Sequence, residues 1–261
     1  MKNILALPRH KSLLSDLAYI GLNVGLAVAV LALVIAVDSP LPAFALVLLS
    51  KWRMFAVRPR FWFKNVQSNL VDIIVGLSVV VLLSAASGSV VAQFVIAGFY
   101  AVWLLFIKPR SKRSFVLFQA GAALFLGTNA LFMTAADWSG AFVVALMWLI
   151  GYSTARHVLS HYRETERTFF SMVWGLVIAE IGWLAYHWTF AYNFPGLPGI
   201  DLSQAAIIVL VLGFLATRAY DSYHRNEGAL QTSDLLLPAA FSASIILIIL
   251  FFFNTLGTGL L

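Results

Sequence analysis

The chain has 261 residues, of which 61% are hydrophobic and only 11% are charged, and its 17 Lys and Arg residues outnumber its 11 Asp and Glu residues. A soluble globular domain carries about 25% charged residues because its surface faces water, so this composition excludes a soluble fold and indicates a helical membrane protein. The chain has no cysteine, which excludes disulfides and thiolate metal sites.

Eight apolar runs have the length that a transmembrane helix needs, which is about 17–25 residues. They cover approximately 17–37, 68–86, 90–107, 115–135, 139–158, 168–190, 203–219 and 235–254. A shorter run at 41–56 has Lys51 and Arg53 near its end, and their side chains are expected to snorkel to the headgroups. Asp72 lies at the start of the run at 68–86 and is expected near the same membrane surface.

These runs predict an all-α, polytopic transmembrane bundle of about nine helices, or eight if 41–56 is a re-entrant segment. No stretch has the composition of a soluble domain or a disordered tail, so residues 1–261 are expected to form a single integral membrane domain.

The basic residues indicate the orientation of the chain. They fall into five segments, one before the first run and the others after the runs that end near 56, 107, 158 and 219. If successive runs form hairpins, all five segments lie on one side of the membrane, and the positive-inside rule makes that side cytoplasmic. We therefore predict a cytoplasmic N-terminus, an external C-terminus and a bacterial-type cytoplasmic membrane. The positive net charge then reflects orientation, and nucleic-acid binding is not expected.

The stretch IAEIGWLAYHW (178–188) carries the first candidate site. By helix rise Glu180 lies near the bilayer midplane, about 20 Å from the inner end of its helix, and it is the only ionisable group identified at that depth. His187 follows seven residues later on the same helix face, with Trp183 between them, and Asn129 belongs to a set of polar residues in the outer half. We predict that these four residues bind an ion or a substrate. The alternative is a neutral Glu180 that hydrogen-bonds neighbouring helices together.

A second candidate site lies at cytoplasmic helix ends. His157 and His161 are four residues apart, and Asp221 and His224 are three apart, so each pair shares a helix face, as metal ligands must. The alternative is that these residues are ordinary interfacial side chains in solvated loops.

Two further features concern partners. Residues 51–65 interleave basic and aromatic side chains, and Arg58, Arg60, Trp62 and Lys64 are predicted to contact lipid headgroups, including anionic ones. The GxxxG of Gly21 and Gly25 permits close helix packing and suggests a homo-oligomer or a membrane partner. For each feature the simpler alternative is ordinary helix anchoring or packing.

Two functions remain from this reading. The first is a small-solute or proton-linked ion transporter or channel with a midplane acid. The alternative is a non-catalytic scaffold or accessory subunit that docks partners through helix faces and basic cytoplasmic loops. An enzyme is the least favoured class, because the loops are short and lack nucleophile or nucleotide motifs, and no cofactor is predicted.

Overall fold

The computed structural model describes residues 13–162, 164–188, 191–193, 201–226 and 228–252. Within these ranges the chain is almost entirely helical. The α-helices are α1 (Leu13–Ala36), α2 (Leu41–Leu49), α3 (Trp62–Ala85), α4 (Val90–Val102), α5 (Arg113–Thr134), α6 (Gly140–Tyr162), α7 (Arg167–His187), α8 (Gln204–Arg225) and α9 (Thr232–Phe252). The shorter elements are the 3-10 turns η1 (Trp52–Met54), η2 (Pro59–Phe61) and η3 (Ala86–Gly88), the π-helical turn η4 (Trp103–Ile107), and the strands β1 (Ala191–Asn193) and β2 (Asp201–Ser203).

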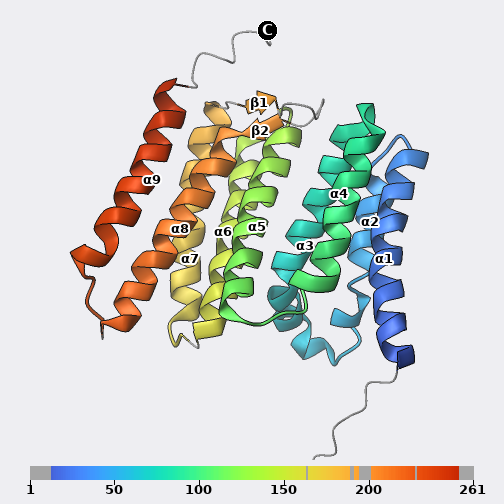
Figure 1. Ribbon diagram of the computed structural model, residues 1–261, viewed down its shortest axis with the longest axis horizontal. Coiled ribbons are helices and arrows are strands. Elements are labelled where there is room, and N and C mark those ends of the chain that lie inside the picture. The colour runs from blue at the N-terminus through green and yellow to red at the C-terminus, as the bar shows by residue number, and fades with distance from the viewer. Residues whose placement is uncertain (1–12, 163, 189–190, 194–200, 227, 253–261) are drawn as a thin grey trace, which may run out of the picture.

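The helices lie side by side and alternate in direction (Figure 1). The connections that follow α2, α4, α6 and α8 lie at the lower end of the view, which is also where α1 begins, whereas β1 and β2 lie at the upper end. The alternation agrees with the predicted hairpins and gathers the described basic segments at one end. The N-terminal basic segment within 2–11, Arg163 and the C-terminal residues 253–261 lie outside the described residues.

Eight of the helices in the described ranges are long and apolar enough to cross a membrane, and α2 is not among them. Its nine residues span about 14 Å, roughly half of a hydrocarbon core about 30 Å thick. The hydroxyl of Ser50 donates to Val47 O at 2.6 Å just where the helix ends. The chain then continues through η1 and η2 to the lower end (Figure 1), so the predicted run at 41–56 forms a short helix followed by tight turns.

The core consists of apolar side chains from α1 to α8, and Val30, Val47, Val80 and Val143 are fully buried. Lipid offers no hydrophobic driving force between helices, so their association depends on close packing.

Glycines permit that close packing between α6 and α7. A Cβ placed on Gly182 would lie 2.5 Å from Met147 Cγ, and one on Gly151 would lie 2.7 Å from Ile178 Cβ. By contrast, a Cβ on Gly21 or Gly25 would have no atom within 4 Å. Within the described chain the predicted GxxxG therefore makes no helix contact.

A small cap of two strands lies at the upper end, against α5 and α8 (Figure 1). Strands β1 and β2 pair antiparallel, with Tyr192 opposite Leu202. Asn129 of α5 holds β2 in place, because its Oδ1 accepts from Ser203 N at 2.7 Å and its Nδ2 donates to Asp201 O at 3.1 Å.

Candidate functional site

The most unusual polar cluster in the described chain is centred on Asp72, and we call Lys51, Asp72 and Lys108 the lysine–aspartate triad. Asp72 lies ten residues into α3, about 15 Å from the first residue of the helix, and is 8% exposed. Lys51, in the turn after α2, is 5% exposed. The expectation that Lys51 snorkels to the headgroups is therefore wrong, because α2 ends early and directs this side chain toward α3. Asp72 likewise lies inside the bundle and not at a helix start.

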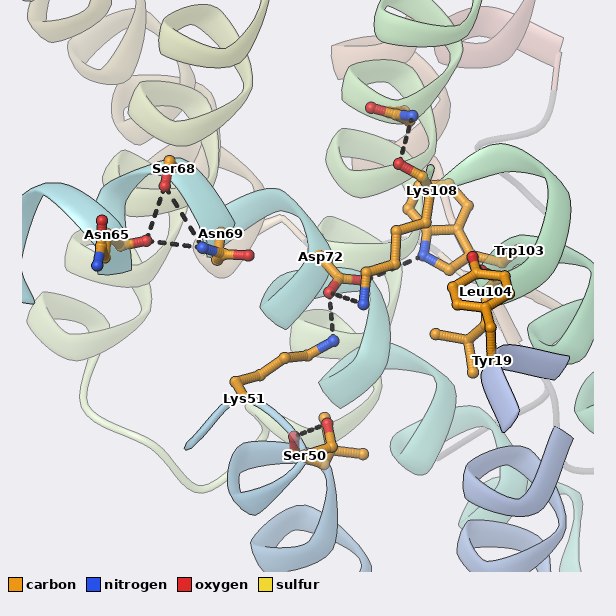
Figure 2. Close-up of polar contacts among 12 residues, drawn as sticks. Tyr19, Ser50, Lys51, Asn65, Ser68, Asn69, Asp72, Trp103, Leu104 and Lys108 are labelled. Atoms are coloured by element: carbon orange, nitrogen blue, oxygen red, sulfur yellow. Dashed lines mark hydrogen bonds and ion pairs between the residues drawn. The ribbon is translucent and has the colours of Figure 1, made fainter. Parts of the chain in front are cut away.

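The triad joins three separate segments through one carboxylate (Figure 2). Lys51 Nζ donates to Asp72 Oδ2, and Lys108 Nζ lies 2.8 Å from the same oxygen. The indole N–H of Trp103 donates to the other oxygen, Oδ1, at 3.3 Å. Two ammonium groups thus face one carboxylate, which leaves one positive charge unbalanced when all three groups are ionised.

The π-helical turn η4 explains how Trp103 and Lys108 reach the same acid. In a regular α-helix two residues five positions apart differ by about 140° in direction. In η4 the backbone N–H of Lys108 donates to Trp103 O at 2.9 Å, which closes a turn of five residues and stacks these two residues on one face. Such turns occur frequently at functional sites.

This widened turn leaves Leu104 O without its usual donor. The N–H of Lys108 is already used, and Pro109, five residues after Leu104, has no N–H to offer. The hydroxyl of Tyr19 on α1 donates to Leu104 O at 3.1 Å and so replaces the missing backbone N–H donor. The shape of the site thus depends on a side chain from α1, which is far from η4 in sequence but in contact with it (Figure 2).

Gln119 of α5 fixes the end of the same turn. Its Nε2 donates to Ile107 O at 2.6 Å and to Arg110 O at 3.0 Å, so its Oε1 faces His157 Nε2 at 2.8 Å. Since Gln119 Oε1 can only accept, His157 must carry a proton on Nε2. A continuous polar network therefore connects α6 to the segment that ends in Lys108.

Tyr100 adds a polar group without a partner beside the triad. Its ring is 1% exposed, and its hydroxyl has no hydrogen-bond partner among the described residues. A Cβ placed on Gly76 of α3, one helical turn after Asp72, would lie 3.2 Å from that hydroxyl. A buried donor left unpaired is costly, so this hydroxyl would favour a partner that can accept its hydrogen bond.

The predicted ion or substrate residues lie apart from the triad. Glu180, Trp183 and His187 are all exposed on one face of α7, and the Trp183 and His187 rings lie 4.6 Å apart. His187 Nδ1 contacts Trp183 O at 2.9 Å. Their shared face agrees with the seven-residue spacing, but Glu180 faces away from the bundle. Asn129 is buried and hydrogen-bonds to β2 of the cap.

The predicted metal ligands contact different partners. His157 contacts Gln119, and Asp221 binds Arg113 and accepts from Tyr162 Oη at 2.5 Å. His161 contacts the Tyr162 ring edge-on at 6.1 Å between ring centres. His224 Nε2 lies 2.7 Å from Tyr220 Oη and 3.5 Å from Glu164 Oε2. The described residues contain no group of three or more metal-ligating side chains close enough to hold an ion.

The predicted lipid-contact residues are exposed at the lower end. Arg58, Arg60, Trp62 and Lys64 all lie on the surface. The indole N–H of Trp62 donates to Val57 O at 2.9 Å and to Phe55 O at 3.1 Å, which fixes the loop that presents the arginines.

Sequence reasoning did not identify the triad, although a signal was present. Asp72 interrupts an otherwise apolar stretch, and Lys51 and Lys108 each follow a run that is a neighbour of that stretch in the chain. Comparisons with protein-family models, with curated proteins and with solved structures give no match for this chain.

Proposed function

We propose that the protein is a small-solute or ion transporter of a bacterial-type cytoplasmic membrane, and that the lysine–aspartate triad is its ion-responsive site. The observation that carries the proposal is the sharing of one buried carboxylate oxygen by Lys51 and Lys108. Ionisable side chains inside transmembrane bundles are rare, and they commonly mark ion or substrate pathways.

The triad has two alternative states. With Asp72 ionised, its carboxylate attracts the segment after α2 and the end of η4 toward α3. Protonation of Asp72 removes that attraction and leaves two like charges facing each other. The same event then favours separation of α2 and α4 from α3. A ligand shifts a conformational equilibrium only through such a difference in interaction between two states.

A structural role alone explains the triad less well. A buried ion pair is often no more stabilising than apolar residues of similar size, because both charges lose their hydration. A third, unbalanced charge adds to that cost. The Tyr100 hydroxyl beside the triad offers a donor that the described residues leave unused.

Flux measurements on purified protein in lipid vesicles test the proposal. A pH-sensitive dye inside the vesicles reports protons, and electrodes report potassium and chloride, under an imposed membrane potential. We expect Asp72→Asn to lower the flux by about tenfold or more, which corresponds to the loss of roughly one charge-assisted hydrogen bond. Asp16→Asn is the matched control, because Asp16 is an exposed acid in the first turn of α1.

Two results would overturn the transport proposal. One is an unchanged flux in a folded Asp72→Asn variant. The other is wild-type flux of all three ions no higher than in protein-free vesicles.

Glu180, with Trp183, His187 and Asn129, remains a second proposed ion or substrate position. Because Glu180 is exposed on α7, an ion would reach it from the side of the bundle that faces away from the other helices. Replacement by Gln separates the alternatives: a titrating site loses flux or its pH dependence, and a neutral hydrogen-bonding role keeps both. The proposed metal role of His157, His161, Asp221 and His224 is tested by metal analysis of the purified protein.

The exposure of Glu180 favours one other function, docking of a membrane partner. A carboxyl near the midplane is costly against lipid, and a second chain packed on α7 would cover it. Gly21 and Gly25 on α1 offer another open surface. The natural chain has no cysteine, so Leu184→Cys and Gly25→Cys provide clean single sites for self-cross-linking in membranes. Absence of cross-linked dimers at both sites argues against a homo-oligomer through these faces.

Residues 51–65 are proposed to hold anionic lipid at the cytoplasmic surface. Arg58, Arg60 and Lys64 are exposed there, next to Trp62. Each basic residue near an anionic surface contributes about 1 kcal/mol of attraction.

A further inference from the structure

A large cavity lies away from the triad, among α5, α6, α7 and α8. Its volume is about 1370 Å³, and part of its boundary is open to the outside. Clefts that bind drug-sized molecules measure about 300–1,000 Å³, so this cavity suits a larger ligand.

The walls of the cavity are apolar. Large side chains such as Phe118, Phe170 and Phe214 line it together with small ones such as Ala155. The two threonines in the walls use their hydroxyls within their own helices, since Thr154 donates to Ile150 O at 3.0 Å and Thr217 donates to Gly213 O at 2.8 Å. A polar metabolite or an extended peptide would find few partners in this part of the cavity.

The cavity has the depth of one membrane leaflet. Its lining on α5 runs from Arg113 to Leu126, and its lining on α8 runs from Arg225 back to Leu210. These stretches of 13 and 15 helical steps correspond to about 20 Å and 22 Å. Half of a typical hydrocarbon core is about 15 Å thick. The cavity therefore starts at the lower surface and reaches slightly past the midplane.

The lower end of the cavity has unbalanced positive charge. Arg113 pairs with Asp221, and Arg225 Nη1 lies 3.7 Å from Asp234 Oδ2. Arg218 stacks over the Phe214 ring at 5.2 Å, and no acidic side chain of the described residues lies within 4 Å of it. Three arginines thus face two aspartates, and Arg218 is the one without an acidic partner.

We propose that this cavity binds one anionic phospholipid from the cytoplasmic leaflet, with its phosphate at Arg218 and its acyl chains along the walls of α5, α6 and α8. The apolar walls, the leaflet depth and the partly open boundary suit acyl chains. The guanidinium of Arg218 suits a phosphate, which it can bind through two parallel hydrogen bonds. This site is independent of the triad and of any flux through it.

Native mass spectrometry of the full chain tests the site. The protein is extracted from vesicles that contain phosphatidylglycerol and phosphatidylcholine in equal amounts, and the lipid retained per chain is counted. We expect one retained phosphatidylglycerol and a preference over phosphatidylcholine of about fivefold or more. Arg218→Gln is expected to bring the preference close to one. Arg110→Gln removes an exposed arginine at the same end of the bundle, outside both the cavity and residues 51–65, and is expected to leave the preference unchanged.

Variants that fill the cavity provide a second, independent test of the lipid site. Ala155→Phe and Ala216→Phe place a ring in the space for the acyl chains and are expected to remove the retained lipid. Ala240→Phe, on the exposed face of α9, is the size-matched control. Thermal unfolding shows which variants are folded. One folded cavity variant, either Ala155→Phe or Ala216→Phe, is enough for the test.

Three results overturn the proposal. The first is retention of the same lipid by a folded cavity variant. The second is equal retention of the two lipids by the wild type, which would indicate an apolar crevice without headgroup recognition. The third is displacement of phosphatidylglycerol by millimolar inorganic phosphate, which would indicate a free-phosphate site.

Discussion

Lys108 and Asp72 lie 36 residues apart in sequence, and Lys108 Nζ lies 2.8 Å from Asp72 Oδ2 inside the bundle. The contact depends on η4, which rotates the end of α4 so that Lys108 stands over Trp103. The hydroxyl of Tyr19 donates a hydrogen bond to Leu104 O, the carbonyl that this turn leaves without a backbone donor. An irregular helix end, a proline and a tyrosine from another helix thus determine where one ammonium group lies.

The first prediction concerns the support of that turn. Tyr19→Phe removes the hydroxyl that donates to Leu104 O. Loss of a partner for a buried carbonyl costs about 1–3 kcal/mol, so we expect a lower thermal unfolding midpoint. Tyr223→Phe is the matched control, because the two side chains are exposed to the same extent, 41% for Tyr223 and 42% for Tyr19, and it should leave the midpoint within error. Equal midpoints for both variants would contradict the assigned role of Tyr19.

The second prediction separates the stability of the triad from its function. Asp72→Asn leaves the buried Lys51 ammonium and the partly exposed Lys108 ammonium without a counter-charge, and it is expected to destabilise the fold by up to about 3–5 kcal/mol, the cost of breaking a fully buried pair. The triple variant Lys51→Met, Asp72→Leu and Lys108→Met removes all three charges and should recover most of that loss, because apolar replacement of buried ion pairs is often neutral. Its ion flux should stay as low as that of Asp72→Asn. Denaturation in detergent and flux in vesicles measure the two properties, and recovered flux would show that the charges are not required.

The third prediction concerns the contact between α6 and α7. Gly182→Ala introduces a Cβ 2.5 Å from Met147 Cγ and is expected to destabilise the protein by about 1–3 kcal/mol. Gly25→Ala is the control. It meets no atom within 4 Å and gains helix propensity, so it should be neutral or stabilising by up to about 1 kcal/mol. Similar effects of the two substitutions on the unfolding midpoint would be inconsistent with this packing.

The fourth prediction concerns acid sensitivity in the connection between α6 and α7. The hydrogen bond from Tyr220 Oη lowers the pKa of Glu164. A carboxyl whose pKa is lowered by folding adds stability above its unfolded pKa of about 4.3, and that stability is lost as the pH falls through the lower folded value. Tyr220→Phe should therefore flatten the decline of the unfolding midpoint below about pH 4.5. An equally steep decline in both proteins would exclude this hydrogen bond as its cause.

The fifth prediction tests the orientation. Ser139 lies in the connection between α5 and α6, and Ser111 lies between η4 and α5. In the cysteine-free background, a membrane-impermeant maleimide should label Ser139→Cys in intact cells. Ser111→Cys should react only after permeabilisation, since the positive-inside rule places it in the cytoplasm. The reverse labelling pattern would show that the bundle has the opposite orientation in the membrane.

The helices and their alternation could be predicted because lipid imposes two simple requirements. A spanning helix needs a long apolar run, and basic residues remain on one side. These requirements identify eight spans without any knowledge of packing. They do not predict where a helix ends inside the bundle, so the early end of α2 and the burial of Lys51 were missed.

The candidate site shows a related limit. Helix rise gives the depth of Glu180, but its direction depends on which face of α7 packs on α6. The glycines at 175 and 182 turn one face of α7 toward α6, and Glu180 lies on the exposed side. The Asp72 site needs a π-helical turn, which has no clear sequence signature beyond the Lys108–Pro109 pair. Residue types alone therefore could not bring its members together.

Asn129 has a consequence for how the protein behaves at high local concentration. Its amide pairs with Ser203 N and Asp201 O much as the peptide group of a third strand would. The free edge of β2 is thereby occupied by a single side chain. Unpaired strand edges are templates for aggregation, and here the amide of Asn129 blocks that template at the end of the bundle opposite the described basic segments.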